Sequence, residues 1–144
     1  MLDISAFPTE PREDDWAFVF SGRNTVTSLR GQPGMPWLVA EVSSQWDVDM
    51  KTAIPVGRWQ ERGVWAFSVP ENDIDLTQQL SGNLYSLLGR VDDGLFHAHG
   101  RAYQLLHWRD THRYCGRCGT ETRTIEDGRA VLCERCTRRV YPRV

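Results

Sequence analysis

The sequence predicts an α+β protein: an N-terminal domain with an antiparallel sheet and helices, followed by a small four-cysteine zinc ribbon. Three observations predict it. Short strand-like runs separated by turn residues fill the first 70 residues. Apolar residues then recur at helical spacing, and two Cys-x-x-Cys pairs lie near the end of the chain. We place the N-terminal domain at residues 1–110 and the ribbon at residues 111–144.

The N-terminal domain begins with an irregular, acidic lead-in over residues 1–15. Aromatic and β-branched runs then predict strands at residues 16–20, 25–29, 37–42, 58–60 and 64–69. Ser21-Gly22 and Glu61-Arg62-Gly63 are turn signals that close two hairpins, and residues 32–36 form a loop rich in Pro and Gly. Close turns between successive strands favour antiparallel pairing.

Helical periodicity replaces the strand pattern after residue 80. Apolar groups at helical spacing predict a helix over residues 83–88 and a clearer one over residues 95–108. In the second, one face carries Ala98, Ala102, Leu105 and Leu106. Gly100 weakens that helix but does not exclude it.

Composition indicates a globular protein, with 40% hydrophobic and 25% charged residues. No apolar run approaches the ~20 residues of a membrane helix, and residues 1–5 lack the basic start of a signal peptide. We therefore expect no membrane association and a cytoplasmic location. Residues 107–144 hold nine of the seventeen basic residues, which suits either contact with phosphates or a solvated surface.

The four cysteines have the spacing of a zinc site: Cys115 and Cys118 form one pair, Cys133 and Cys136 the other, with fourteen residues between the pairs. Residues 122–132 are expected to form a hairpin with its turn at residues 126–128. Gly116 and Gly119 suit tight turns that need positive φ. Four thiolates complete a tetrahedral zinc and leave no position for water, so the predicted metal is structural.

The cysteine and histidine pattern also allows other interpretations. One alternative is that the four cysteines form two disulfides or remain free thiols. A reducing cytosol favours metal binding over disulfides. A redox Cys-x-x-Cys lacks its usual βαβ context here. His107 and His112 lie near the pairs, but the four-cysteine set is complete without them. We expect both, together with His97 and His99, to be helix-surface residues.

The C-terminal half resembles the bacterial NADH pyrophosphatases, which are Nudix hydrolases. The resemblance is carried by the segments Gly94-Leu95-Phe96, Gly100-Arg101-Ala102, Leu105, Trp108, His112 to Gly119, Cys136 and Tyr141-Pro142-Arg143. It covers residues 94–144 well, and residues 1–93 match in layout alone. It implies a parent enzyme that cleaves the diphosphate of NAD(H) to NMN(H) and AMP and removes NAD caps from RNA.

One departure from that family concerns catalysis. The Nudix box, with its Arg-Glu-x-x-Glu-Glu core, is absent from this sequence. The glutamates of that box hold magnesium or manganese on the diphosphate, which catalysis needs to neutralise developing charge. We therefore expect this chain to be the N-terminal domain and the zinc ribbon of such an enzyme. It should be inactive alone, with no catalytic residue of its own.

The resemblance also implies a homodimer and a role for Tyr141, whose ring would stack near the nicotinamide or the base next to the cap. The alternative is that Tyr141 and Pro142 only pack the exit from the ribbon. Arg143 would bind a carboxylate or phosphate, or remain solvated. Two other functions stay open for the chain: a free-standing nucleic-acid-binding zinc ribbon, and a dimerisation scaffold.

Overall fold

The computed structural model describes residues 2–29 and 34–143, with Leu80 described by its backbone only. The main sheet has the strand order β4-β5-β1-β2-β6, and β3 pairs with the start of β1. These strands are β1 (Trp16–Ser21), β2 (Asn24–Ser28), β3 (Trp37–Leu38), β4 (Ile54–Trp59), β5 (Arg62–Ser68) and β6 (Gln79–Gly82). A separate sheet at the C-terminal end holds β7 (Arg123–Ile125), β8 (Ala130–Cys133) and β9 (Arg138–Val140).

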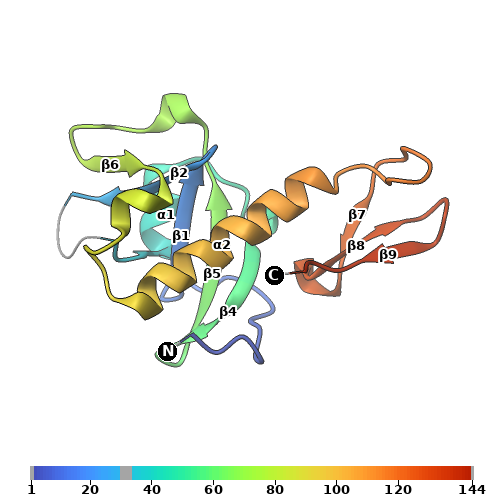
Figure 1. Ribbon diagram of the computed structural model, residues 1–144, viewed down its shortest axis with the longest axis horizontal. Coiled ribbons are helices and arrows are strands. Elements are labelled where there is room, and N and C mark those ends of the chain that lie inside the picture. Colours follow the sequence, from blue (N-terminus) through green and yellow to red (C-terminus); the bar gives the residue numbers. More distant parts are fainter. Residues whose placement is uncertain (1, 30–33, 144) are drawn as a thin grey trace.

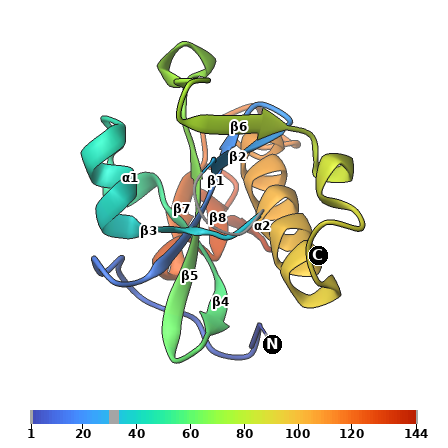
Figure 2. The ribbon, with the colours of Figure 1, turned by 90° about the vertical axis from the view of Figure 1, so that its left-hand side faces the viewer.

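The helices cover both faces of the main sheet. α1 (Val39–Gln45) lies on one side and the long α2 (Asp93–Thr111) on the other, as Figure 2 shows. Short 3-10 turns occur as η1 (Met50–Thr52), η2 (Glu71–Asp73), η3 (Leu84–Leu87) and η4 (Glu126–Gly128). In Figure 1, α2 crosses the sheet and leads directly into the β7–β9 ribbon. This arrangement confirms the predicted α+β class.

Alternation along the strands divides the core into two layers. On β1, Ala17 and Val19 face α1, whereas Phe18 and Phe20 face α2. Tryptophans enrich the α1 layer, which contains Trp37, Trp46 and Trp65. On the predicted stripe of α2, Ala98, Ala102 and Leu105 are buried, whereas Leu106 is only partly buried. Leu95 and Trp108, near the two ends of the helix, are also buried.

Pairing within the main sheet differs from the prediction at one position. β1 and β5 run parallel, with Ala17 opposite Trp65 and Val19 opposite Phe67, while the other neighbouring pairs are antiparallel. β5 does not follow β1 through a tight turn, because β2, β3, α1 and β4 lie between them in the chain. Such a long connection permits parallel pairing, and local patterns do not reveal it.

The predicted strand over residues 37–42 is wrong beyond Leu38, because α1 begins at Val39. Glu41 explains the switch: its carboxylate accepts the Leu38 backbone N–H at 2.9 Å, as an N3 glutamate does in a capping box. The expected helix at residues 83–88 is the 3-10 turn η3, which begins where the Asn83 side chain accepts the Ser86 N–H at 3.2 Å.

The β4–β5 turn and the start of β4 also differ from the prediction. The β4–β5 turn lies at Gln60 and Glu61, which have φ of 51° and 65°, and not at residues 61–63. β4 accordingly runs from residue 54, earlier than predicted. Within the predicted loop at residues 32–36, positions 32 and 33 lie outside the described residues, and Gly34 adopts a turn with φ of 75°.

Asp15 and His99 are buried, although the sequence pattern placed them in an irregular lead-in and on a helix surface. Asp15 is 4% exposed and accepts the backbone N–H of Gly63 at 3.0 Å and the indole N–H of Trp65 at 2.9 Å. It thereby ties the start of β1 to β5. His99 is 1% exposed and lies in the α2 layer beside Phe18, so the surface prediction for it is wrong. Exposed His97 and His107 match the prediction.

None of the helices in the described part of the chain is both long enough and apolar enough to cross a membrane.

Candidate metal centre

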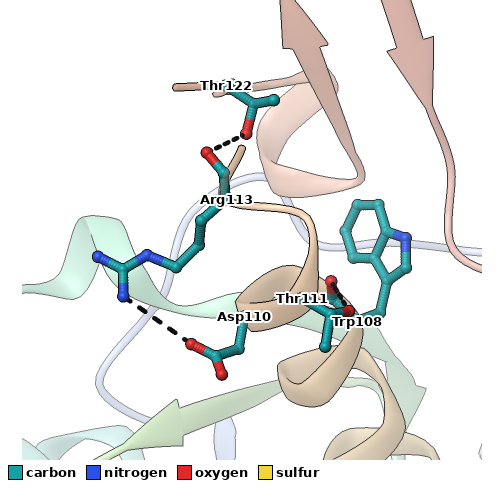
Figure 3. Close-up of polar contacts among 5 residues, drawn as sticks. All are labelled: Trp108, Asp110, Thr111, Arg113 and Thr122. Carbon is teal, nitrogen blue, oxygen red and sulfur yellow. Dashed lines mark hydrogen bonds and ion pairs between the residues drawn. The ribbon is translucent and has the colours of Figure 1, made fainter. Parts of the chain in front are cut away.

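The ribbon starts where α2 ends, and short-range hydrogen bonds fix the change in chain direction (Figure 3). The Thr111 hydroxyl donates to the Trp108 carbonyl at 3.0 Å, and Arg113 lies 3.9 Å from Asp110. The Thr122 hydroxyl reaches back to the carbonyls of His112 at 2.7 Å and Arg113 at 3.1 Å. The first cysteine loop, residues 114–121, is therefore clamped at its base.

The predicted hairpin is present in the ribbon. β7 pairs with β8 in antiparallel register, with Thr124 opposite Val131, and η4 forms the turn over residues 126–128. β9 adds a third strand on the other side of β8, with Val131 opposite Val140. This pairing returns the second cysteine pair to the first.

The four thiols converge on one point. The sulfur atoms of Cys115, Cys118, Cys133 and Cys136 all lie within 4.8 Å of one another, and those of Cys118 and Cys133 are 3.5 Å apart. Cys115 and Cys133 are buried, whereas Cys118 and Cys136 are partly exposed. Four sulfurs at ~2.3 Å from a tetrahedral zinc stand about 3.8 Å apart, so the cluster fits this ion with small adjustments.

Backbone donors surround the sulfurs in both knuckles. The N–H of Arg117 points to the Cys115 sulfur, and the N–H of Cys136 points to the Cys133 sulfur, each at 3.4 Å. The first knuckle ends at Gly119 with φ of 76°, as predicted, but Gly116 does not adopt positive φ. Thr137 holds the corresponding position of the second knuckle, with φ of 55°.

Hydrogen bonds favour the thiolate forms of Cys115 and Cys118, whereas the nearby sulfurs oppose the thiolate form of Cys136. Hydrogen bonds from the backbone of Cys118 and Arg117 lower the pKa of Cys115, and Thr120 lowers the pKa of Cys118 to about 6. The neighbouring Cys118 raises the pKa of Cys136 to about 12. Four thiolates therefore need a cation among them, and Zn²⁺ supplies that charge. Sequence analysis missed Thr120, although a hydroxyl two residues after a cysteine is a visible signal.

The histidines near the ribbon lie apart from this cluster. The His112 ring stacks on Trp108 at 5.4 Å between centroids, and its Nδ1 lies 2.8 Å from the Trp108 carbonyl oxygen. His107 is exposed and faces Tyr103. Within residues 2–29 and 34–143, the four cysteines alone form a group of three or more side chains with the placement of metal ligands.

Tyr141 lies after β9 and is half exposed. Its hydroxyl donates to the carboxylate of Glu126 in the ribbon turn. Together with Pro142 it lines a small cavity between the ribbon and the N-terminal domain. Arg143 lies beside Tyr103, Gln104 and His107 at the edge of α2. Contact of Tyr141 with a substrate stays a prediction.

Comparison with known proteins identifies both parts of the chain. The family described as NADH pyrophosphatase-like rudimentary NUDIX domain matches residues 14–108, and the NADH pyrophosphatase zinc ribbon domain matches residues 110–141. The chain belongs to the NADH pyrophosphatase family. The first match, to the rudimentary Nudix domain, covers two thirds of the chain, and the four-thiol cluster lies in the second match.

Curated relatives of this NADH pyrophosphatase family member carry the name NAD-capped RNA hydrolase NudC. The protein from Photorhabdus laumondii is 33% identical over 92% of this chain. Those from Yersinia enterocolitica and Pectobacterium carotovorum are 34% and 35% identical over 71% of it. The chain covers 46% of the first relative and 36% of the other two, so it spans less than half the length of the proteins it matches.

Proposed function

We propose that this chain is the N-terminal and zinc-ribbon portion of an enzyme that hydrolyses the diphosphate of NAD(H) and of NAD-capped RNA. In this proposal Cys115, Cys118, Cys133 and Cys136 hold one structural zinc ion. The observation that carries it is the coincidence of a four-thiol cluster with a zinc ribbon of the NADH pyrophosphatase type, directly after a rudimentary Nudix domain. The chain would divide at residue 110 into those two units.

The catalytic metal would lie elsewhere in the whole enzyme. The sequence has no Nudix box, and within the described ranges no carboxylate cluster has the placement of a metal site. Magnesium or manganese would therefore be bound by a catalytic domain outside this sequence. This chain would be the non-catalytic N-terminal part of a cytoplasmic homodimer. The molar mass in solution tests the dimeric state directly.

A chimera tests the function. The part of the Photorhabdus relative that follows its ribbon would be joined after Arg143, and hydrolysis of NADH with manganese would be followed by the release of AMP. We expect the 144-residue chain alone to be inactive, because it lacks the glutamates that hold the metal, and the chimera to be active.

Two results would contradict this proposal. One is turnover that co-purifies with the isolated chain through successive columns. The other is a folded, zinc-loaded chimera that leaves NADH intact while the authentic relative cleaves it under the same conditions.

Tyr141 gives a sharper test in the active chimera. If its ring stacks on the nicotinamide, Tyr141→Ala should lower kcat/KM for NADH by a factor that corresponds to about 1–3 kcal/mol, the free energy lost with one base-stacking contact. Tyr141→Phe should be nearly neutral, because stacking needs the ring and not the hydroxyl that now bonds Glu126. Equal losses in the two variants would exclude stacking. Loss of zinc or of the dimer in Tyr141→Ala would make it a packing residue.

A further inference from the structure

The ribbon turn rests on the N-terminal domain through the end of α2. Arg109, in the last turn of that helix, donates from Nη2 to the Gly128 carbonyl at 2.7 Å and from Nη1 to the Thr52 carbonyl at 3.4 Å. A Cβ added at Gly128 would lie 3.0 Å from Arg109 Nη2 and 3.3 Å from Pro55 Cδ. The turn and β4 are therefore in close contact, and we call this contact the seam.

A cavity of about 180 Å³ lies in the seam. Its walls come from the N-terminal lead-in, β4, α2, the ribbon turn and the residues after β9. The lining residues are Phe7, Ile54, Pro55, Arg101, Leu105, Trp108, Gly128, Arg129, Tyr141 and Pro142. Liquid water occupies roughly 30 Å³ per molecule, so this space admits a small ion with a few waters but is below the ~300 Å³ of a typical organic ligand site.

Two arginines line this cavity, the partly buried Arg101 and the exposed Arg129. Arg101 enters from α2 and is held by a bond from its Nε to the Val56 carbonyl at 3.1 Å. Arg129 enters from the ribbon, with its guanidinium 4.1 Å from the centre of the Phe7 ring. Each contact orients the side chain without using all of its N–H donors. No aspartate or glutamate is among the described lining residues.

Two donors next to the cavity lack partners within the described structure. Trp108 is 8% exposed, lines the cavity and has a buried indole N–H without an acceptor. The buried Nε of Arg109 also has no acceptor. Buried donors of this kind are normally satisfied by an atom such as an ordered water or an ion. The carboxylate of Glu126, in the ribbon turn, accepts from Tyr141.

Arg101 and Arg109 also lack electrostatic compensation. Burial lowers the pKa of Arg109 to about 10 and lowers that of Arg101, and no neighbouring carboxylate opposes the effect for either group. Both remain cations at neutral pH, so each carries a desolvation cost that an anion would offset.

We propose that the seam cavity binds a phosphate-type oxyanion between Arg101 and Arg129, and that this ion fastens the zinc ribbon to the N-terminal domain. Guanidinium groups recognise the oxygens of phosphate through paired N–H donors, and the indole N–H of Trp108 adds a neutral donor. An anion that contacts both units binds the docked state better than the undocked one, so it stabilises docking.

Thermal unfolding of the zinc-loaded 144-residue chain tests this site. Phosphate and sulfate would be added from 0.1 to 10 mM in sodium chloride at constant ionic strength, with zinc content measured at each point. We expect a saturable rise in Tm of several degrees with both ions. The rise should disappear in Arg101→Gln and in Arg129→Gln, and remain in Arg135→Gln, a control that removes an exposed ribbon arginine.

A second measurement keeps the test decisive if Arg101→Gln folds poorly. Broadening of the phosphate signal in ³¹P NMR should occur with the wild type and with Arg101→Lys, which keeps the charge, and vanish with Arg129→Gln. The proposal would be overturned by a Tm rise that persists in both glutamine variants, because that is general salting-out. It would also be overturned by no rise at all, or by an equal loss in the Arg135→Gln control.

Discussion

Replacing Cys133 by serine should abolish zinc binding and unfold the ribbon while the N-terminal domain stays folded. Cys133 is buried at 2% exposure, and its sulfur is 3.5 Å from that of Cys118. The ribbon has little else to hold it, since its buried apolar side chains beyond the cysteines are Ala130 and Val131. Structural zinc in comparable small domains contributes about 10–16 kcal/mol of apparent binding free energy, which is then folding free energy.

The measurement combines elemental zinc analysis with hydrogen exchange. We expect less than half an equivalent of zinc per chain and fast exchange of the β7–β9 amides. Protection should persist in β1 and β5, whose core is independent of the ribbon. Arg135→Ser is the matched control, because it adds a serine between the same two cysteines without removing a sulfur. A variant at Cys133 that keeps full zinc and a protected ribbon would show that the cluster is not the metal site.

The ribbon could be predicted from the sequence because its determinants are local. Two cysteine pairs at fixed spacing, a glycine after the first pair and a turn sequence between them leave few arrangements. By contrast, the parallel contact of β1 with β5 depends on pairing between segments that are over 40 residues apart. The sequence pattern predicts a strand where α1 lies because Val39 and Val42 have high β propensity, and tertiary burial with the Glu41 cap overrides that propensity.

Residues of the seam were unpredictable for a similar reason. Arg101, Arg109 and Arg129 look like ordinary surface arginines in the sequence, and only docking of the ribbon turn beside α2 brings them together. His99 belongs to the same class. Its burial depends on how α2 packs against β1, where the His99 ring contacts Phe18 and Phe20.

Acidification should destabilise the N-terminal domain through His99. Its Nε2 lies 2.6 Å from the Gly34 carbonyl oxygen, which only accepts, so Nε2 carries the hydrogen. Nδ1 is then free to accept from the Thr25 hydroxyl at 3.3 Å. Burial, opposed in part by the Gly34 contact, lowers the pKa of His99 from 6.5 to about 4. The native state therefore holds a neutral imidazole.

The sign of the pH effect follows from that lowered pKa. Above pH 6.5 the imidazole is neutral in both native and unfolded chains, and no free energy of unfolding is lost. Between pH 6.5 and 4 the unfolded chain binds the proton and the native chain does not. The free energy of unfolding therefore decreases as the pH is lowered through this range. At 1.36 kcal/mol per pKa unit, the full loss is about 3 kcal/mol at pH 4 and about 2 kcal/mol at pH 5.

A comparison of variants isolates this effect from zinc release, which acid also promotes. Urea unfolding of the N-terminal domain would be followed from pH 7.5 to 4.5 in the wild type, in His99→Gln and in His97→Gln, whose histidine is exposed. His99→Gln lowers stability at neutral pH, but its curve should be flatter by about 2 kcal/mol between pH 6.5 and 5. His97→Gln should follow the wild type. Parallel curves for the wild type and His99→Gln would mean that His99 is not the group that titrates.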